Sequence, residues 1–448
     1  MTRLARELTL YGLTMVAIGS CIGSGIFVTP AQIASLVPSA WHIIAVWAVG
    51  GLITLTGALT FGEIGGLFPK AGGIYVFLKE AYGGWIGFLY GWAYLLIITS
   101  GSIAVLSLAF TYYLGFFIPM SEAGRMITSI IVIISVTTIN ILRAKFGEIF
   151  SNLFTGLKIA GICIIIFFGI FFGTGSLSFG SSVPAGNVTL TNFGVALVGV
   201  LFSYGGWQHA SFLAGEAKNP GRNVAIAMTV GALVVIAVYI LINFSYMRLL
   251  PVSAIAKSDK VAAEAASVVL PAGGMLVAAI IAVCTLGTIG IYTLSSPRIY
   301  YAMADDGLFF KQIAVVHPKF RTPIFAIITQ SVWSILLLLF WGTFEDLITY
   351  TVSVEWIFFA FAAGGIFIFR KRYRDAQRPF RTPGYPVTPI IFIVIVIWFV
   401  FNIWINKPLH AEVGAGFLVL GLPIYFYFSR KNRNMPAKTG EGIELNGD

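Results

Sequence analysis

Apolar residues come in long blocks along almost the whole chain, separated by short polar stretches. A block of about 20 residues can cross a hydrocarbon core of roughly 30 Å as a helix. The blocks lack the two-residue alternation of a barrel strand, so helices satisfy their backbone groups best. The pattern therefore predicts an all-α polytopic membrane protein. The twelve expected transmembrane spans are 9–36, 41–66, 83–117, 125–142, 150–173, 191–214, 223–249, 270–301, 323–341, 345–369, 387–405 and 411–429.

Two of these blocks contain small residues at mid-membrane depth, where they interrupt the apolar pattern. The first interruption is GSCIGSGIF at 19–27 in span one, and the second is LFSYGGWQHASF at 201–212 in span six. Transporters built from two inverted five-helix repeats have discontinuous helices at such corresponding positions. We therefore predict inverted repeats over about 9–173 and 191–369, followed by two additional helices over 387–429.

Residues 1–429 are expected to form a single transmembrane domain, because no loop is long enough for a separate one. Residues 430–448 are predicted to be a disordered cytoplasmic tail. With both termini in the cytoplasm, most of the 28 Lys and Arg residues lie in cytoplasmic segments, as the positive-inside rule requires. The net charge of +10 then reflects loops facing anionic membrane lipid, and no nucleic-acid partner is expected.

The chemistry of a broken membrane helix indicates a ligand, because freed backbone groups are costly in lipid unless they face one or line a polar cavity. The helix N-terminus after a break favours a carboxylate, and the carbonyls before it favour an ammonium group. Together the breaks predict a site for a zwitterionic amino acid. The alternative is that the glycines only allow close helix packing. The predicted substrate-binding residues are Ile18, Cys21, Gly23, Ser24, Gly25, Phe202, Ser203 and Gly205.

Three motifs resemble those of the amino acid/polyamine/organocation (APC) superfamily, and within it the L-type amino-acid transporters (LAT family) and their prokaryotic relatives. They are GSGIF in span one, FSYGGW followed by GEAKNPGRN in span six, and SSPRIYYAMADDGLF after span eight. The resemblance implies a LeuT-like fold and α-amino-acid transport by alternating access. It places the carboxylate-binding amides on Ser24 and Gly25 and the amino-group carbonyls on Cys21 and Phe202, with Phe202 also an aromatic gate.

Lys158 is the only basic residue that we place well inside a span, so it is a functional candidate. The resemblance implies that this lysine substitutes for a bound sodium ion. An ammonium near the break of span one could hydrogen-bond its free carbonyls, which predicts sodium independence. The alternative is a lysine that snorkels to the end of its span. Proton coupling through Lys158 also stays open, because burial disfavours the charged form.

Four other polar residues in the spans are weaker candidates. Glu355 is either a proton acceptor, a pocket residue that favours polar or cationic side chains, or a carboxyl bonded to a neighbouring helix. Gln208 and His209 could line the pocket from span six, although a lone histidine is more often a packed, hydrogen-bonded residue. Glu63, near the cytoplasmic end of span two, is expected to cap or gate.

The leading hypothesis is a sodium-independent secondary transporter of neutral L-amino acids, most simply an exchanger, in the plasma membrane of a prokaryote. The alternatives are a proton-coupled symporter, of which a symporter for cationic amino acids is one form, and a non-transporting sensor. No nucleophile-base pair indicates an enzyme. The three cysteines, Cys21, Cys163 and Cys284, lie in spans without a metal-ligand spacing, so we expect no metal, and no cofactor is expected either. The resemblance implies that a heavy chain would pair through a cysteine between spans three and four; the loop FFIPMSEAGRM has none, so no disulfide-linked heavy chain is expected.

Overall fold

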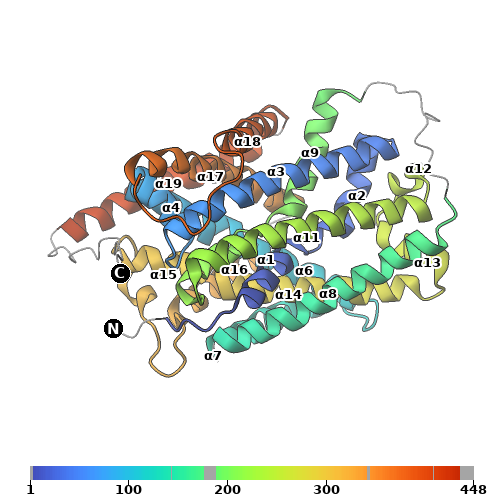
Figure 1. Ribbon diagram of the computed structural model, residues 1–448. Coiled ribbons are helices and arrows are strands. Elements are labelled where there is room, and N and C mark those ends of the chain that lie inside the picture. The colour runs from blue at the N-terminus through green and yellow to red at the C-terminus, as the bar shows by residue number, and fades with distance from the viewer. Residues whose placement is uncertain (1–3, 143, 176–187, 341–343, 407, 434–448) are drawn as a thin grey trace.

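The computed structural model describes residues 4–142, 144–175, 188–340, 344–406 and 408–433. Every regular element in these residues is helical, apart from one isolated bridge between Leu8 and Ala217. The helices lie roughly side by side in one bundle (Figure 1). The predicted all-helical architecture is therefore confirmed.

The helices are numbered in chain order. The first half contains α1 (Leu10–Cys21), α2 (Gly25–Leu36), α3 (Ala40–Leu67), α4 (Ile74–Tyr82), α5 (Gly84–Ala93), a π-helical turn η1 (Tyr94–Ile98), α6 (Thr99–Leu114), α7 (Glu122–Leu142) and α8 (Ala144–Phe172). The second half contains α9 (Leu190–Tyr204), α10 (His209–Phe212), η2 (Ala214–Glu216), α11 (Pro220–Leu249), α12 (Val252–Ile255), α13 (Val261–Val269), α14 (Gly273–Ser295), α15 (Pro297–Asp305), η3 (Lys311–Ala314), α16 (Ile324–Phe340), α17 (Phe344–Arg372), α18 (Val387–Asn406) and α19 (Pro408–Arg433).

Several helices begin where a hydroxyl side chain can replace the missing intrahelical acceptor. The side chain of Thr9 accepts from the N–H of Gly12 at the start of α1, and Ser39 and Thr189 cap α3 and α9 in the same way. These caps fix the entry points of the helices that surround the site.

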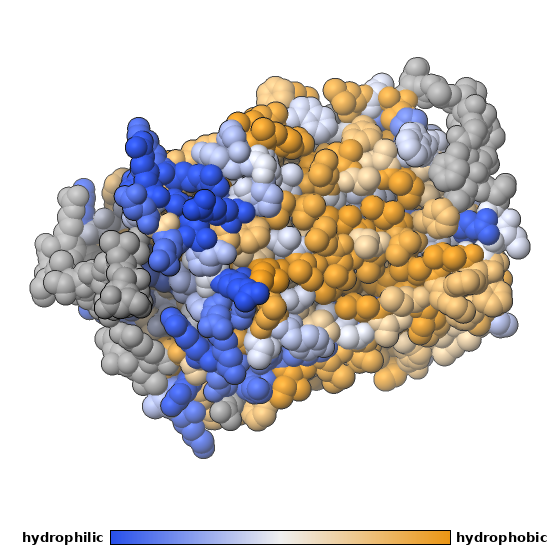
Figure 2. All heavy atoms as spheres, in the orientation of Figure 1, coloured by the Kyte–Doolittle hydropathy of each residue, from blue (hydrophilic) through white to orange (hydrophobic). Residues whose placement is uncertain are grey.

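Within the described residues, seven helical segments are long and apolar enough to cross a membrane, and an eighth is counted if the bent pair α1 and α2 is one span. Apolar side chains cover the long sides of the bundle, whereas hydrophilic ones gather mainly at one end (Figure 2). The first described residues and the end of α19 lie at that end (Figure 1). This distribution is typical of a protein with its long axis across a bilayer.

The observed boundaries differ from the expected spans in three places. Helix α8 begins at Ala144, six residues before the predicted start at 150, so that α7 and α8 follow each other almost directly. The predicted span 270–301 is divided into α14 and α15 at Ser296, and together the two helices form one apolar segment, Gly273–Asp305. Helix α19 continues to Arg433, so residues 430–433 are helical and not part of a disordered tail. The remainder of the predicted tail, 434–448, lies outside the described residues.

Helix α1 lies inside the bundle, where it packs against α8, α11 and α14. Helix α11 packs along α3, and α14 along α6 and α8. Residues 12, 13 and 16–21 of α1 are all buried. The interruption after Cys21 is therefore surrounded by protein and not by lipid.

Candidate functional site

The first interruption separates α1 from α2. Helix α1 ends at Cys21, α2 begins at Gly25, and their axes differ in direction by 42°. The N–H of Ile22 closes the end of α1 by donating to the carbonyl of Ile18 at 3.0 Å. At the start of α2 the first N–H groups have no acceptor within the helix, and the Ser24 side chain makes no capping bond. The start of α2 is thus a set of donors available to an anion.

The second interruption follows α9 and lies against the first. Gly206 has a φ of +125° that side chains rarely adopt, and a Cβ there would lie 2.5 Å from the carbonyl carbon of Ser20. The hydroxyl of Ser20 donates to the carbonyl of Gly206 at 2.7 Å. The continuation of the helix is shorter than the predicted span to 214, since α10 covers only His209–Phe212. Only glycine allows this close approach of the two breaks.

One tyrosine connects the two interruptions. The hydroxyl of Tyr239, on α11, lies 2.8 Å from the carbonyl oxygen of Cys21 and 3.1 Å from that of Ser203. The Cys21 carbonyl also accepts from the N–H of Gly23 at 2.9 Å. The shorter of the two contacts assigns the single O–H hydrogen of Tyr239 to Cys21, so both lone pairs of the Cys21 carbonyl oxygen are used in this conformation. The carbonyl of Phe202 accepts one bond, from the N–H of Gly205 at 3.2 Å, and keeps capacity for another.

A cavity of about 50 Å³ lies between the two interruptions, α6 and α14. Seven of the eight predicted substrate-binding residues line it, and the exception, Ile18, uses its carbonyl to end α1. The cavity also has lining residues that the sequence analysis did not identify. The lining residues are Ser20, Cys21, Gly23, Ser24, Gly25, Gly101, Ser102, Val105, Leu106, Phe202, Ser203, Gly205, Thr288 and Tyr292.

The glycines of the first interruption differ in how closely their neighbours pack against them. A Cβ on Gly25 would lie 2.8 Å from the Ser203 hydroxyl, so Gly25 allows α2 to start against the end of α9. A Cβ on Gly19 would lie 2.0 Å from the Thr155 hydroxyl. Gly23 differs, because the nearest atom to its Cβ would be 3.7 Å away. Close packing explains Gly19 and Gly25 but not Gly23.

Lys158, on α8, reaches the first interruption directly. Its Nζ donates to the carbonyl of Gly19 and to the hydroxyl of Thr288, each at 2.7 Å, and the side chain is fully buried. The Thr288 hydroxyl lies 3.3 Å from the Gly19 carbonyl oxygen and 3.2 Å from that of Ile22. The ammonium therefore lies beside the carbonyl end of α1 and does not snorkel to the end of α8.

A second cavity of about 30 Å³ shares Ser102, Phe202, Gly205 and Tyr292 with the first. Gln208, His209 and Glu355 line it, so the structure brings the three weaker candidates together. The amide of Gln208 donates to the Glu355 carboxylate at 3.0 Å, and its oxygen accepts from the N–H of Gly206 at 2.9 Å.

His209 is held by hydrogen bonds and by stacking. Its Nδ1 lies 2.6 Å from the Ser295 hydroxyl, and its Nε2 lies 3.2 Å from the Tyr94 hydroxyl. The ring stacks on Tyr292 with 4.5 Å between centroids. These contacts fit the packed, hydrogen-bonded histidine of the sequence analysis, and they orient Tyr292 beside both cavities.

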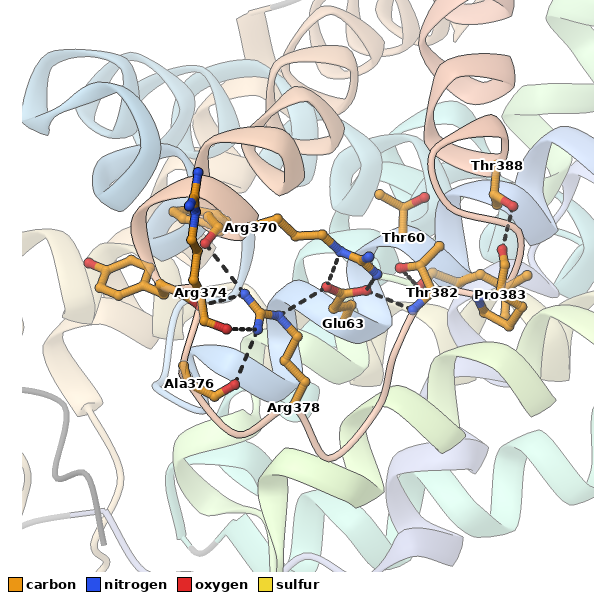
Figure 3. Close-up of polar contacts among 12 residues, drawn as sticks. Thr60, Glu63, Arg370, Arg374, Ala376, Arg378, Thr382, Pro383 and Thr388 are labelled. Carbon is orange, nitrogen blue, oxygen red and sulfur yellow. Dashed lines mark hydrogen bonds and ion pairs between the residues drawn. The ribbon is translucent and has the colours of Figure 1, made fainter. Parts of the chain in front are cut away.

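Glu63 lies away from both cavities, at the end of α3. Its carboxylate accepts from Arg370 at 2.9 and 2.7 Å and from the N–H of Thr382 at 2.7 Å (Figure 3). These contacts fit the expected capping or gating position and place Glu63 outside the substrate-binding residues.

The residues missed by the sequence analysis come mainly from α6 and α14. Ser102, Thr288 and Tyr292 carry polar groups, but hydroxyl residues occur throughout the predicted spans. Their only signal was a small or polar side chain in an apolar block, which does not identify the face that it occupies. Described residues show no group of three or more His, Cys, Asp or Glu side chains placed to hold a metal ion.

Known proteins match this chain over nearly its full length. The family model described as amino acid permease matches residues 8–428. The serine/threonine exchanger SteT of Bacillus subtilis (strain 168) is 32% identical over 94% of this chain and 96% of its own length. The human b(0,+)-type amino acid transporter 1 is 28% identical over 99% of this chain and 92% of its own length. The human large neutral amino acids transporter small subunit 2 is 27% identical, over 94% and 80% respectively.

Proposed function

Because the chain belongs to the amino acid permease family, in the APC superfamily, and is a relative of the L-type transporters, we propose that it exchanges neutral L-amino acids independently of sodium. Its family and relatives are transporters, so the chain is a transporter and not an enzyme. The family and the apolar helices also make it a multi-pass membrane protein. The observation that carries the proposal is the cavity that both broken helices line.

The cavity offers complementary backbone groups to the two charged ends of an α-amino acid. The carboxylate would accept from the free N–H groups at the start of α2, near Ser24 and Gly25, where the helix dipole also favours negative charge. The amino group would donate to the remaining acceptor capacity of Phe202 and Ser203 at the end of α9. Cys21 would become an acceptor when the Tyr239 hydroxyl moves away.

The neutral side-chain preference is supported by the remaining lining of the cavity. Val105, Leu106 and Tyr292 present apolar surface, and Ser102 and Thr288 present hydroxyls. Such a mixture suits a small aliphatic or hydroxylated side chain, and none of the described residues that line this first cavity is charged. The name of the bacterial exchanger, which refers to serine and threonine, points to the same size of substrate.

Sodium independence is supported by the position of Lys158. Its ammonium donates to the carbonyl of Gly19, where a cation could otherwise neutralise the end of α1. A protein that carries this charge covalently needs no ion to complete the site, so transport is expected to follow amino-acid gradients.

We further propose the twelve-span, LeuT-like architecture, with repeats over about 9–173 and 191–369 and both termini in the cytoplasm of a prokaryotic cell. The bent α1 and α2 and the broken α9 and α10 support the repeats, since they occupy corresponding positions in the two halves. The loop FFIPMSEAGRM between the predicted spans three and four has no cysteine to pair with a heavy chain.

A proton-coupled symporter is the second candidate, and one observation favours it. The Glu355 carboxyl is buried next to the second cavity, where a proton could be taken up and released close to substrate. The same carboxyl would favour a cationic side chain. Coupling would then involve Glu355 or Lys158.

The decisive experiment measures uptake of radiolabelled alanine and serine into sealed liposomes that contain the purified protein, in sodium-free buffer. Uptake that requires unlabelled amino acid inside the liposomes, and that external sodium does not change, is the expected result. Uptake driven by an imposed proton gradient with empty liposomes would favour the symporter. Binding without uptake under any gradient would indicate a sensor and contradict transport.

A further inference from the structure

The end of α17 and the loop that leads to α18 form a basic cavity at one end of the bundle, about 230 Å³ in volume. Four arginines line it, and we refer to Arg370, Arg374, Arg378 and Arg381 as the arginine cluster. The cluster is separate from the two cavities between the broken helices, because it shares no lining residue with them.

Glu63 holds two members of the cluster and thereby shapes the loop. Its carboxylate accepts from Arg370 and lies 3.3 Å from the Nε of Arg378. Arg378 also donates to the carbonyl of Tyr373 at 2.7 Å, and the ring of Tyr385 lies 3.7 Å from the Arg370 guanidinium carbon. These two arginines therefore have structural partners, and their contacts fold the loop against α3.

The other two arginines are not neutralised. Arg374 and Arg381 are exposed, and no carboxylate of the described chain forms an ion pair with either. In Figure 3 the guanidinium groups of Arg370 and Arg378 point to Glu63, whereas the side chain of Arg374 points away from it. One carboxylate among four guanidinium groups leaves a strong local excess of positive charge. Guanidinium groups bind phosphate oxygens in a bidentate manner, so a phosphate is the anion that this geometry suits best.

The surface next to the cluster indicates where such a phosphate would come from. Helix α18 starts at Val387, six residues after Arg381, and its exposed side chains include Val387, Ile390, Val394 and Ile397. Their spacing places them along one face of the helix. Figure 2 shows hydrophilic residues at this end of the bundle adjoining the apolar surface. A charged cavity continued by an exposed apolar helix face matches a molecule with a phosphate head and apolar tails.

We propose that the arginine cluster binds the phosphate of an anionic phospholipid, with its acyl chains along the exposed face of α18. Arg374 and Arg381 supply the new contacts to the phosphate, while Glu63 keeps Arg370 and Arg378 in place. Basic pockets at the ends of membrane helices bind anionic headgroups in this way. The site would attach the α17–α18 loop, and through Glu63 the end of α3, to the membrane surface.

The test compares lipid binding by the full-length protein and a double variant, Arg374→Ala with Arg381→Ala. Native mass spectrometry in nonionic detergent measures the Kd for phosphatidylglycerol, for phosphatidylcholine, and for inorganic phosphate at matched ionic strength. We expect the wild type to bind phosphatidylglycerol at least tenfold more tightly than phosphatidylcholine. The double variant should lose at least tenfold in its affinity for phosphatidylglycerol, and inorganic phosphate should not compete.

The matched control is the double variant Lys371→Ala with Lys319→Ala, which removes two positive charges from exposed side chains that do not line the cavity. Its affinity should stay within twofold of the wild type. An equal loss in the control would show a general charge effect and overturn the proposal, as would unchanged binding in the arginine variant. Effective competition by inorganic phosphate would indicate a site for a soluble anion and overturn the lipid assignment. If the alanine variant does not fold, the double variant Arg374→Lys with Arg381→Lys tests whether these two side chains bind the phosphate, because it keeps the charge and loses the bidentate contacts. An affinity for phosphatidylglycerol equal to that of the wild type would then contradict the proposed geometry.

Discussion

Replacing Lys158 with alanine tests the role of the charge beside the broken helix α1. The variant loses the hydrogen bonds from Nζ to the Gly19 carbonyl and the Thr288 hydroxyl. A hydrogen bond from a charged donor contributes about 1.5–3 kcal/mol, so the pair is worth about 3–6 kcal/mol before the cost of burying the ammonium. The Thr288 hydroxyl, 3.3 Å from the Gly19 carbonyl, compensates part of this loss. The expected loss of hydrogen-bond energy in the variant is therefore at the lower end of this range, about 3 kcal/mol.

This energy predicts the size of the transport defect. A change of 1.4 kcal/mol alters an equilibrium constant about tenfold. A loss of about 3 kcal/mol therefore lowers the population of molecules in which the break after α1 is held ready to bind substrate roughly 100-fold. Uptake of radiolabelled alanine in sodium-free proteoliposomes should fall to about 1% of the wild type if that arrangement limits transport. The control Thr155→Val removes the hydrogen bond from the Thr155 hydroxyl to the Met15 carbonyl on α1, at 3.2 Å, and keeps Lys158 with its hydrogen bond to the Gly19 carbonyl. Its uptake should remain within about threefold of the wild type.

Two results would refute this reasoning. The first is a folded Lys158→Ala protein, judged by its thermal unfolding midpoint and elution volume, that takes up alanine at more than half the wild-type rate without sodium. The second is a Thr155→Val protein that loses as much activity as Lys158→Ala, since the defect would then reflect loss of packing between α1 and α8. Either result would mean that the charge of Lys158 does not complete the site.

Three further predictions test other contacts. Gly23→Ala should leave the thermal unfolding midpoint unchanged, because its Cβ has no neighbour closer than 3.7 Å, and should raise the KM for uptake, because Gly23 lines the cavity. Gly19→Ala should lower the midpoint, because its Cβ collides with Thr155. Glu63→Gln should lower the free energy of unfolding by about 1–3 kcal/mol, measured by chemical denaturation, since a hydrogen bond to a charged group is worth this much. An unchanged value would contradict the role of Glu63 in holding Arg370 and Arg378. Glu216→Gln should cost about 3–5 kcal/mol in the same assay, because the fully buried guanidinium of Arg298, which donates to both Glu216 carboxylate oxygens, would lose its counter-charge.

The interruptions at 19–27 and 201–212 could be predicted because glycine and serine disturb an apolar block in a way that sequence patterns reveal. The structure ends α1 at Cys21 and α9 at Tyr204, both within the predicted stretches. Lys158 was also predictable, since an ionisable side chain in a span is rare and expensive. These features depend on local composition, which is written directly in the chain.

The partners of these features could not be predicted, because they depend on how helices are rotated and placed in depth. Thr288 and Tyr239 contact the first interruption from positions more than 200 residues away, and nothing in their own blocks distinguishes them from other hydroxyl residues. The use of both Cys21 lone pairs follows from one such distant contact. The π-helical turn at Tyr94–Ile98, which shifts the face that α6 presents, has no clear sequence signal either.

The contacts between the two interruptions have a consequence for how the protein is assembled. The Ser20 hydroxyl and the Cys21 thiol find acceptors on Gly206 and Tyr204, which are synthesised more than 180 residues later. While the first half is in the membrane alone, its broken helix lacks these acceptors and the Tyr239 hydroxyl. We therefore expect the nascent first half to remain loosely packed, and to depend on water or on the insertion machinery, until the second half enters the bilayer.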